Sequence, residues 1–95
     1  MKLEFDGVSI LSESDFHEAL TEALGLSTFY GKNLDALWDL LSRDVERPVL
    51  LEWKNAEISK AAMGDRFDSI VGILRDVEKQ DIEYGWTERF ELALA

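Results

Sequence analysis

Two aspartates, Asp35 and Asp39, stand one helical turn apart in a segment whose spacing is typical of a helix. The segment covers residues 29–41 and reads FYGKNLDALWDLL. Counted from Leu34 at about 100° per residue, the two aspartates fall on one side, at about 100° and 140°. Three leucines fall on the opposite side, at about 240° to 340°: Leu37, Leu40 and Leu41. The pattern predicts two carboxylates that point outward together, leucines that face the core, and Trp38 at the border, partly exposed.

Such a pair of carboxylates could serve several kinds of chemistry. They could act as acid and base, but nothing in the sequence sets their proton affinities apart. They could also bridge a divalent cation weakly. The simplest use is electrostatic: an acidic face flanked by an aromatic side chain enters a basic pocket on another protein, and a nuclease active site is such a pocket. A solvated acidic face, with Trp38 tucked against the core, explains the pattern equally well.

The other residue types that could do chemistry give no constellation. His17 is the single histidine, and no orienting acid or nucleophile is identified for it, so we expect a structural role at a helix surface or core edge. The absence of cysteine excludes disulfides, thiolate catalysis and cysteine-ligated metals. The six glycines match neither a P-loop nor a dinucleotide-binding fingerprint. The sequence therefore predicts no catalytic residue, no metal site and no cofactor.

Composition excludes further classes of function. Twenty acidic and ten basic residues give the 95-residue chain a net charge of −10. That charge argues against binding nucleic acid or an anionic membrane, both of which require a basic surface. It also favours a monomer in the free form. No apolar run is long enough to span a bilayer, and the first residues carry no apolar signal-peptide core, so we expect a cytoplasmic protein or a mature secreted start.

The elements that must position the two aspartates follow from periodicity and from capping residues. The patterns predict strands at residues 2–6, 49–53 and 90–94, and helices from Ser12 to Gly25, from Asn33 to about residue 42, from Asn55 to about residue 63, and from Asp65 onward. Residues 49–53 are nearly all apolar, which favours a strand buried on both faces. Residues 82–88 fit no element. The order predicts one α/β domain over residues 1–95, with a small, mostly parallel sheet.

Residues 30–39, YGKNLDALWD, and residues 48–53, PVLLEW, resemble the barstar family of intracellular ribonuclease inhibitors. The similarity covers most of the chain and runs nearly without gaps to Lys79. It implies an α/β fold in which a three-stranded parallel sheet is packed with helices. It also implies a 1:1 complex in which the second helix and the loop before it plug the active site of a barnase-type, secreted, guanyl-preferring ribonuclease.

The resemblance further implies roles for particular residues. Asp39 would occupy a phosphate-binding position, paired with the arginines and catalytic histidine of the nuclease. Asp35 would contact neighbouring basic residues, and Phe29 would stack near that histidine. Surrounding contacts are implied for Asn33, Leu34, Ala36, Trp38, Ser42 and Arg43, and a peripheral charge for Asp76.

Several positions depart from the family pattern. Barstar itself has tyrosine in place of Phe29, tryptophan in place of Asp44 and glutamate in place of Asp76, and residues 82–88 look like an insertion. These departures leave the identity of the target nuclease open. We therefore weigh three hypotheses: a ribonuclease inhibitor, a barstar-like adaptor that binds a different basic protein, and, far behind, a hydrolase that uses Asp35 and Asp39.

Overall fold

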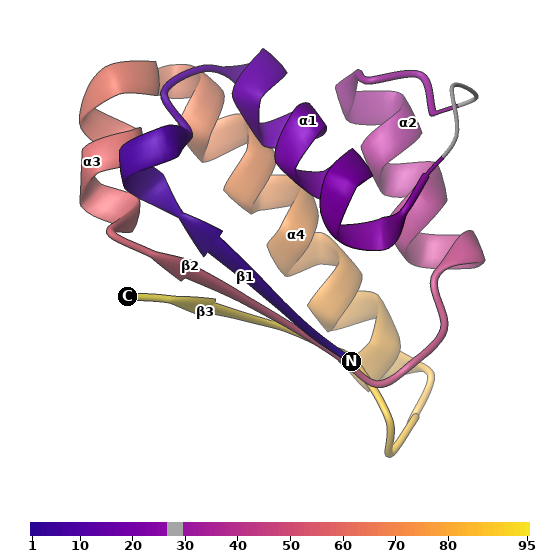
Figure 1. The fold of residues 1–95 in the computed structure, drawn as a ribbon. Helices are drawn as coiled ribbons and strands as arrows, with labels where there is room; N and C mark the ends of the chain where they lie inside the picture. The colour runs from indigo at the N-terminus through magenta and orange to yellow at the C-terminus, as the bar shows by residue number, and fades with distance from the viewer. Residues whose placement is uncertain (27–29) are drawn as a thin grey trace.

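A computed structural model describes residues 1–26 and 30–95 of the chain. Its regular elements follow the predicted order (Figure 1). They are β1 (Lys2–Asp6), a 3₁₀ turn (Gly7–Ser9), α1 (Glu13–Leu24), α2 (Leu34–Asp39), a π-helical turn (Leu40–Asp44), β2 (Val49–Lys54), α3 (Ala56–Met63), α4 (Asp65–Glu83) and β3 (Phe90–Leu94). The expected fold class, α/β with a three-stranded parallel sheet packed with helices, is confirmed.

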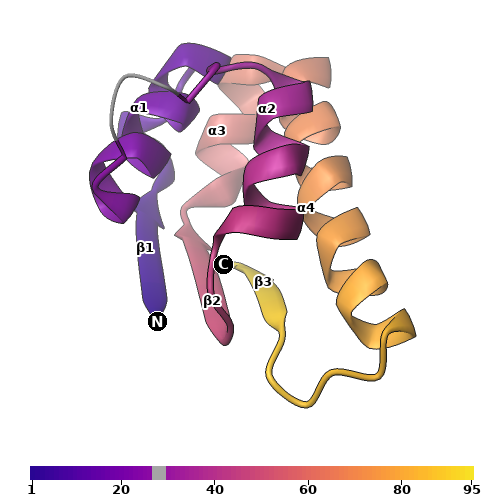
Figure 2. The same cartoon turned by 90° about the vertical axis from the view of Figure 1, so that its right-hand side faces the viewer.

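The sheet has the order β1-β2-β3, and both pairs of strands are parallel. All four helices lie on one side of it, as the two views in Figures 1 and 2 show. Side chains alternate accordingly along β2: Val49, Leu51 and Trp53 are buried, whereas Leu50 and Glu52 are half-buried. The expectation that this strand is buried on both faces is wrong, because an apolar run alone does not show which faces the helices cover.

Charged side chains occupy the uncovered face of the sheet. Lys2 lies 3.2 Å from Glu4 on its own strand and 3.9 Å from Glu52 on β2, and Lys54 lies 3.4 Å from Glu52. Glu4 and Glu52 are direct neighbours in the strand register, so the two lysines separate like charges that would otherwise repel each other. The hydrogen bond from Lys2 lowers the pKa of Glu4, and the charges of Lys54 and Lys2 act in the same direction.

Side-chain hydrogen bonds and left-handed residues mark the ends of α1 and α3. The Ser12 hydroxyl accepts a hydrogen bond from the backbone N–H of Asp15, and the Asp15 carboxylate accepts one from the N–H of Leu11. Gly25 ends α1 in the left-handed conformation, with φ of 63°. Asn55 precedes α3 as expected but does not cap it. It too is left-handed, and its side chain donates to the Asp6 carboxylate instead.

A series of buried hydrogen bonds joins the C-terminal ends of β1 and β2 to α3. The indole N–H of Trp53 donates to the Ser59 hydroxyl, 3.1 Å away, and that hydroxyl donates to the carbonyl of Gly7, 3.2 Å away. Trp53 and Ser59 are fully buried. Gly7 lets the two backbones approach closely, since a Cβ there would lie 2.0 Å from the carbonyl oxygen of Asn55. Only glycine fits at this contact.

We expect Gly7→Ala to destabilise the fold by about 1–3 kcal/mol or more, because the new methyl group meets backbone atoms that cannot move aside. Urea unfolding followed by tryptophan fluorescence measures the change. Gly72→Ala is the matched control: a Cβ at Gly72, within α4, meets nothing within 4 Å. The control should raise stability by about 0.5–1 kcal/mol through helix propensity. Equal effects of the two substitutions would contradict the packing argument.

Candidate functional site

The first turn of α2 is fixed by its N-cap. The Asn33 side-chain oxygen accepts from the backbone N–H of Ala36 at 2.8 Å, and the Asn33 amide donates to the carbonyl of Gly31 at 3.3 Å. The bond to Ala36 satisfies a backbone N–H that the helix itself leaves unpaired. The cap predicted from the sequence is confirmed, and it sets the direction in which α2 leaves the preceding loop.

The structure brings Asp35 and Asp39 to the exposed side of α2. Leu37, on the opposite side, is fully buried, and Trp38 is half-buried at the border, as the helical spacing predicted. Within residues 1–26 and 30–95, neither aspartate forms an ion pair. Two unneutralised carboxylates are thus held one turn apart on a helix of fixed direction, which suits the binding of cationic groups.

The end of this helix differs from the prediction. The chain widens into the π-helical turn after Asp39, whereas a regular helix would bring Asp44 to about 280°, on the side of the leucines. Asp44 is exposed instead. Leu40 packs against the core as expected, but it is only half-buried, whereas Leu37 and Leu41 are fully buried.

The remaining predicted contact residues differ in their exposure and in the element that carries them. Asn33 and Arg43 are exposed on or beside the helix, and Leu34, Ala36 and Ser42 are half-buried. Asp76 is exposed on α4, which runs beside α2 in Figure 2. Phe29 lies outside the described residues. Most of the described members of the predicted set thus lie on α2 and the π-helical turn that continues it, and Asp76 comes from α4.

A buried histidine anchors the chain just before α2. One ring nitrogen of His17, Nδ1, lies 2.7 Å from the Tyr30 hydroxyl, and the other, Nε2, lies 2.8 Å from the Glu13 carboxylate. Only 2% of His17 is exposed, so it is more deeply buried than the expected surface or core-edge position. Burial, with the Glu13 charge, raises the pKa of Tyr30, which stays a neutral hydrogen-bonding group. Both imidazole nitrogens are engaged internally, so this histidine has a structural role.

A buried ion pair anchors the other end of the helix. Arg47 binds Asp81 of α4 through two hydrogen bonds of 2.7 and 3.1 Å, and it also donates to the carbonyl of Val45 at 2.7 Å. The Asp81 carboxylate accepts a further bond, of 2.8 Å, from the N–H of Phe90. Burial alone raises the pKa of Asp81, but the hydrogen bonds from Arg47 and Phe90, with the Arg47 charge, outweigh it and leave the pKa below its usual value.

Sequence reasoning missed this pair. Asp81 is one of many acidic residues on a long amphipathic helix, and Arg47 lies 34 positions away. The only signal in the sequence was an aspartate at the helical spacing of the core residues Leu74 and Val77, which are fully buried like Asp81 itself. A charged side chain on the buried face of a helix needs a partner of opposite charge, because burying an unpaired charge is costly.

Two further features are absent from the described residues. No group of three or more His, Cys, Asp or Glu side chains among them could hold a metal ion. In the same parts of the chain, no helix is both long and apolar enough to cross a membrane.

An acidic helix displayed beside a three-stranded parallel sheet packed with helices is the arrangement that the resemblance of residues 30–39 implies. The chain belongs to the barstar family: the family model described as "Barstar (barnase inhibitor)" matches residues 1–93. A relative from Bacillus subtilis (strain 168) carries the name "Putative ribonuclease inhibitor YrdF". It is 32% identical over 79 residues, which cover 83% of this chain and 87% of the relative.

We expect Asp81→Asn to lower stability at neutral pH by about 3–5 kcal/mol, because it leaves the buried Arg47 guanidinium without its countercharge. The pKa of Asp81 is lower in the folded state than in the unfolded state. The pair therefore stabilises the fold above the unfolded pKa of about 3.9, and this contribution is lost as the pH falls below it. Urea unfolding between about pH 3 and pH 7 should show a flatter acid dependence for the variant.

A double substitution separates the charge from the packing. Arg47→Met with Asp81→Leu removes both charges and keeps apolar volume, so it should lose less stability than Asp81→Asn alone. If the single substitution is as mild as the double one, the pair does not hold this end of the helix.

Proposed function

We propose that this protein inhibits a ribonuclease by inserting the exposed face of α2 into the active site of the enzyme. The carboxylates of Asp35 and Asp39 take the places of RNA phosphates there. The observation that carries the proposal is the pair of exposed carboxylates on α2, without ion-pair partners among the described residues. Membership of a family described as barnase inhibitors and the printed name of the Bacillus subtilis relative support it.

The physical basis of inhibition is occupation of the site. An active site that binds RNA presents cationic groups to phosphates, and a carboxylate is an anionic hydrogen-bond acceptor that the same groups bind. Because both ends of α2 are held by buried contacts, little conformational freedom remains to be lost on binding. No bond is made or broken in this mechanism, and no cofactor takes part. The protein acts as an inhibitor, without catalysis of its own.

The contact surface proposed around the two aspartates includes Phe29 and the residues on α2 and its C-terminal turn. Trp38 supplies a half-buried aromatic surface next to Asp39, an arrangement that recurs at binding hot spots. Asn33, Leu34, Ala36, Ser42 and Arg43 surround the pair, and Asp76 adds a charge from α4.

The proposed partner is a barnase-type, guanyl-preferring ribonuclease, bound in a 1:1 complex in the cytoplasm of the cell that secretes the enzyme. The net charge of −10 supports this choice, because it steers the inhibitor toward a basic protein. Salt should slow this association, since ions screen the attraction over about 10 Å at 0.1 M.

The test is titration of purified inhibitor against a panel of microbial guanyl-preferring ribonucleases at low and high salt. We expect inhibition to be complete at one equivalent, with an association rate that falls with salt. Asp39→Ala should weaken binding by about 2–5 kcal/mol or more, because it leaves a desolvated cation of the enzyme unpaired. That range includes measurements on the barnase–barstar complex itself.

Glu57→Ala is the matched control, since Glu57 is exposed on α3, away from α2. It should bind like the parent apart from a small salt-dependent effect on the rate. Both variants should keep the stability of the parent within about 0.5 kcal/mol. An Asp39→Ala variant that inhibits as well as the parent would exclude this face of α2 as the surface that binds the enzyme. If no ribonuclease in the panel is inhibited, the adaptor hypothesis becomes the better one, and the search turns to other basic proteins.

A further inference from the structure

The two edges of the sheet differ in how their backbone groups are satisfied. On β3, the N–H of Phe90 donates to the Asp81 carboxylate of α4 at 2.8 Å. The next outward residue, Leu92, donates its N–H to Glu78 at 2.6 Å, and its carbonyl accepts from Arg75 at 3.0 Å. Side chains of α4 thus occupy the hydrogen-bonding groups of this edge, which closes it to a further strand.

The other edge, formed by β1, has no such cover. Figure 2 shows β1 at one margin of the sheet, beside α1. The carbonyl of Met1 accepts from the N–H of Leu50 on β2, so the N–H and carbonyl groups of Lys2 and Glu4 point away from β2, because alternate residues of a strand face opposite edges. Within residues 1–26 and 30–95, no other group bonds them. Such groups are a template for a fourth strand.

A groove beside this edge leaves room for a strand. It lies between β1 and α1 and has a volume of about 500 Å³. The wall formed by α1 includes the small side chains of Ala19 and Ala23, which stand one helical turn apart. Paired strands lie about 4.8 Å apart, so an added strand would run between β1 and these alanines.

The β1 groove is acidic. Five of its ten lining residues are aspartate or glutamate, and none of the ten is lysine or arginine. The carboxylates of Asp6 and Asp15 already accept hydrogen bonds from backbone N–H groups. Glu18 and Glu22 are exposed on α1, one turn apart, and neither forms an ion pair in the parts of the chain that the structure describes. The α1 wall therefore favours an occupant with cationic side chains.

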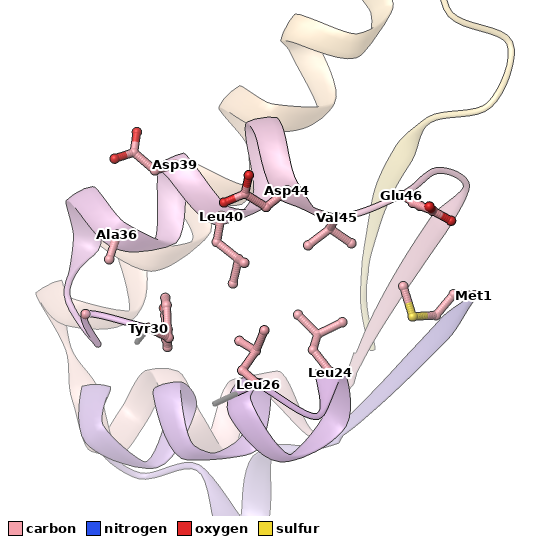
Figure 3. A pocket seen from close by; sticks show the side chains of 11 residues that line it. Met1, Leu24, Leu26, Tyr30, Ala36, Asp39, Leu40, Asp44, Val45 and Glu46 are labelled. Atoms are coloured by element: carbon pink, nitrogen blue, oxygen red, sulfur yellow. The ribbon is translucent and has the colours of Figure 1, made fainter. Parts of the chain in front are cut away.

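A larger hollow, between the C-terminal end of α1 and α2, differs from the β1 groove in its lining. Figure 3 shows that Leu24 extends into it from α1, and Leu40 and Val45 from the opposite side. The carboxylates of Asp39 and Asp44 point away from these apolar side chains (Figure 3). An apolar lining of this kind is compatible with many occupants, whereas the charges of the β1 groove select one class of partner.

We propose that an extended segment of a partner protein, with lysine or arginine at alternate positions, pairs with β1 as a fourth strand. Its backbone bonds the outward groups of Lys2 and Glu4. Its basic side chains lie beside Glu18 and Glu22, because alternate side chains of a strand share one face. None of the residues that line the groove lies on α2 or its π-helical turn, so this inference does not depend on the proposed function.

A second copy of the chain is a poorer occupant of the same edge. Pairing of β1 with β1 would bring two acidic α1 walls together, on molecules that each carry a net charge of −10. Like charges oppose such an approach, whereas a basic segment is attracted to it.

The test is an NMR titration with a capped peptide in which lysine alternates with threonine over the length of β1, five residues. Its neutral counterpart carries glutamine in place of lysine. We expect the lysine peptide to shift the outward amide resonance of Glu4 saturably, and by more than the inward amides of Leu3 and Phe5. This alternation marks strand pairing, since a cation attracted to the surface without pairing would not produce it. The neutral peptide should bind about fivefold more weakly or less well still.

Two pairs of variants separate the charge from the backbone. Glu18→Gln/Glu22→Gln should bind the lysine peptide about fivefold more weakly, the combined effect of two exposed charge pairs. Its control, Glu57→Gln/Glu83→Gln, removes the same charge from exposed positions on α3 and α4 and should bind like the parent.

The second pair changes Glu4 alone. Glu4→Pro removes the outward N–H and places a ring at the edge, and it leaves the bonds to β2 in place. Glu4→Gln removes the same charge and keeps the N–H. The Glu4 carboxylate is already paired with Lys2, so the glutamine variant should bind at most about fivefold more weakly than the parent. The proline variant should bind at least about tenfold more weakly than the glutamine variant, because it loses hydrogen bonds of the added strand.

Several outcomes would overturn the proposal. They are no binding of the lysine peptide to the parent, equal shifts of inward and outward amides, equal binding of the neutral peptide, and unchanged binding by Glu18→Gln/Glu22→Gln. Self-association of the parent that Glu4→Pro abolishes, without peptide binding, would assign the edge to a second copy instead. Amide spectra away from β1 should match the parent in every variant. If the proline variant does not fold, the glutamine variants on α1 still decide the question.

Discussion

The buried ion pair between Arg47 and Asp81 is the contact on which the geometry of the acidic helix depends. It joins three parts of the chain: the carbonyl of Val45 after the π-helical turn, the last turns of α4, and the first N–H of β3 at Phe90. A buried carboxylate needs its charge and its lone pairs satisfied. Arg47 and Phe90 meet both needs, so the helix end, the long helix and the sheet are held in one arrangement.

At the opposite end of α2, hydrogen bonds take the place of the ion pair and also fix the direction of the helix. The hydrogen bonds of His17 fix Tyr30, and Asn33 then sets the first turn. Between these two anchors, α2 presents carboxylates with no partner of their own among the described residues. A protein that must hold like charges side by side gains from rigid supports, because flexible ones would let the charges move apart before a partner arrives.

Much of this arrangement could be predicted from the sequence, and the exceptions have physical reasons. Short-range patterns gave all three strands, the Asn33 cap and the outward face of Asp35 and Asp39, because periodicity and capping act within a few residues. The π-helical turn, the burial of His17 and the Arg47–Asp81 pair depend on groups far apart in the chain. The same holds for the uncovered face of the sheet, since the covering helices are placed by tertiary packing.

That uncovered face has a consequence for how copies of the chain meet. Parallel sheets commonly carry helices on both faces, and a bare, apolar face would invite two sheets to stack. Here a second molecule could stack only by taking Lys2, Glu4, Glu52 and Lys54 out of water, where their mutual ion pairs repay little of the lost hydration. The charged side chains on the sheet thus oppose face-to-face stacking of two copies, even at high concentration. The helical side of the molecule remains accessible to other proteins.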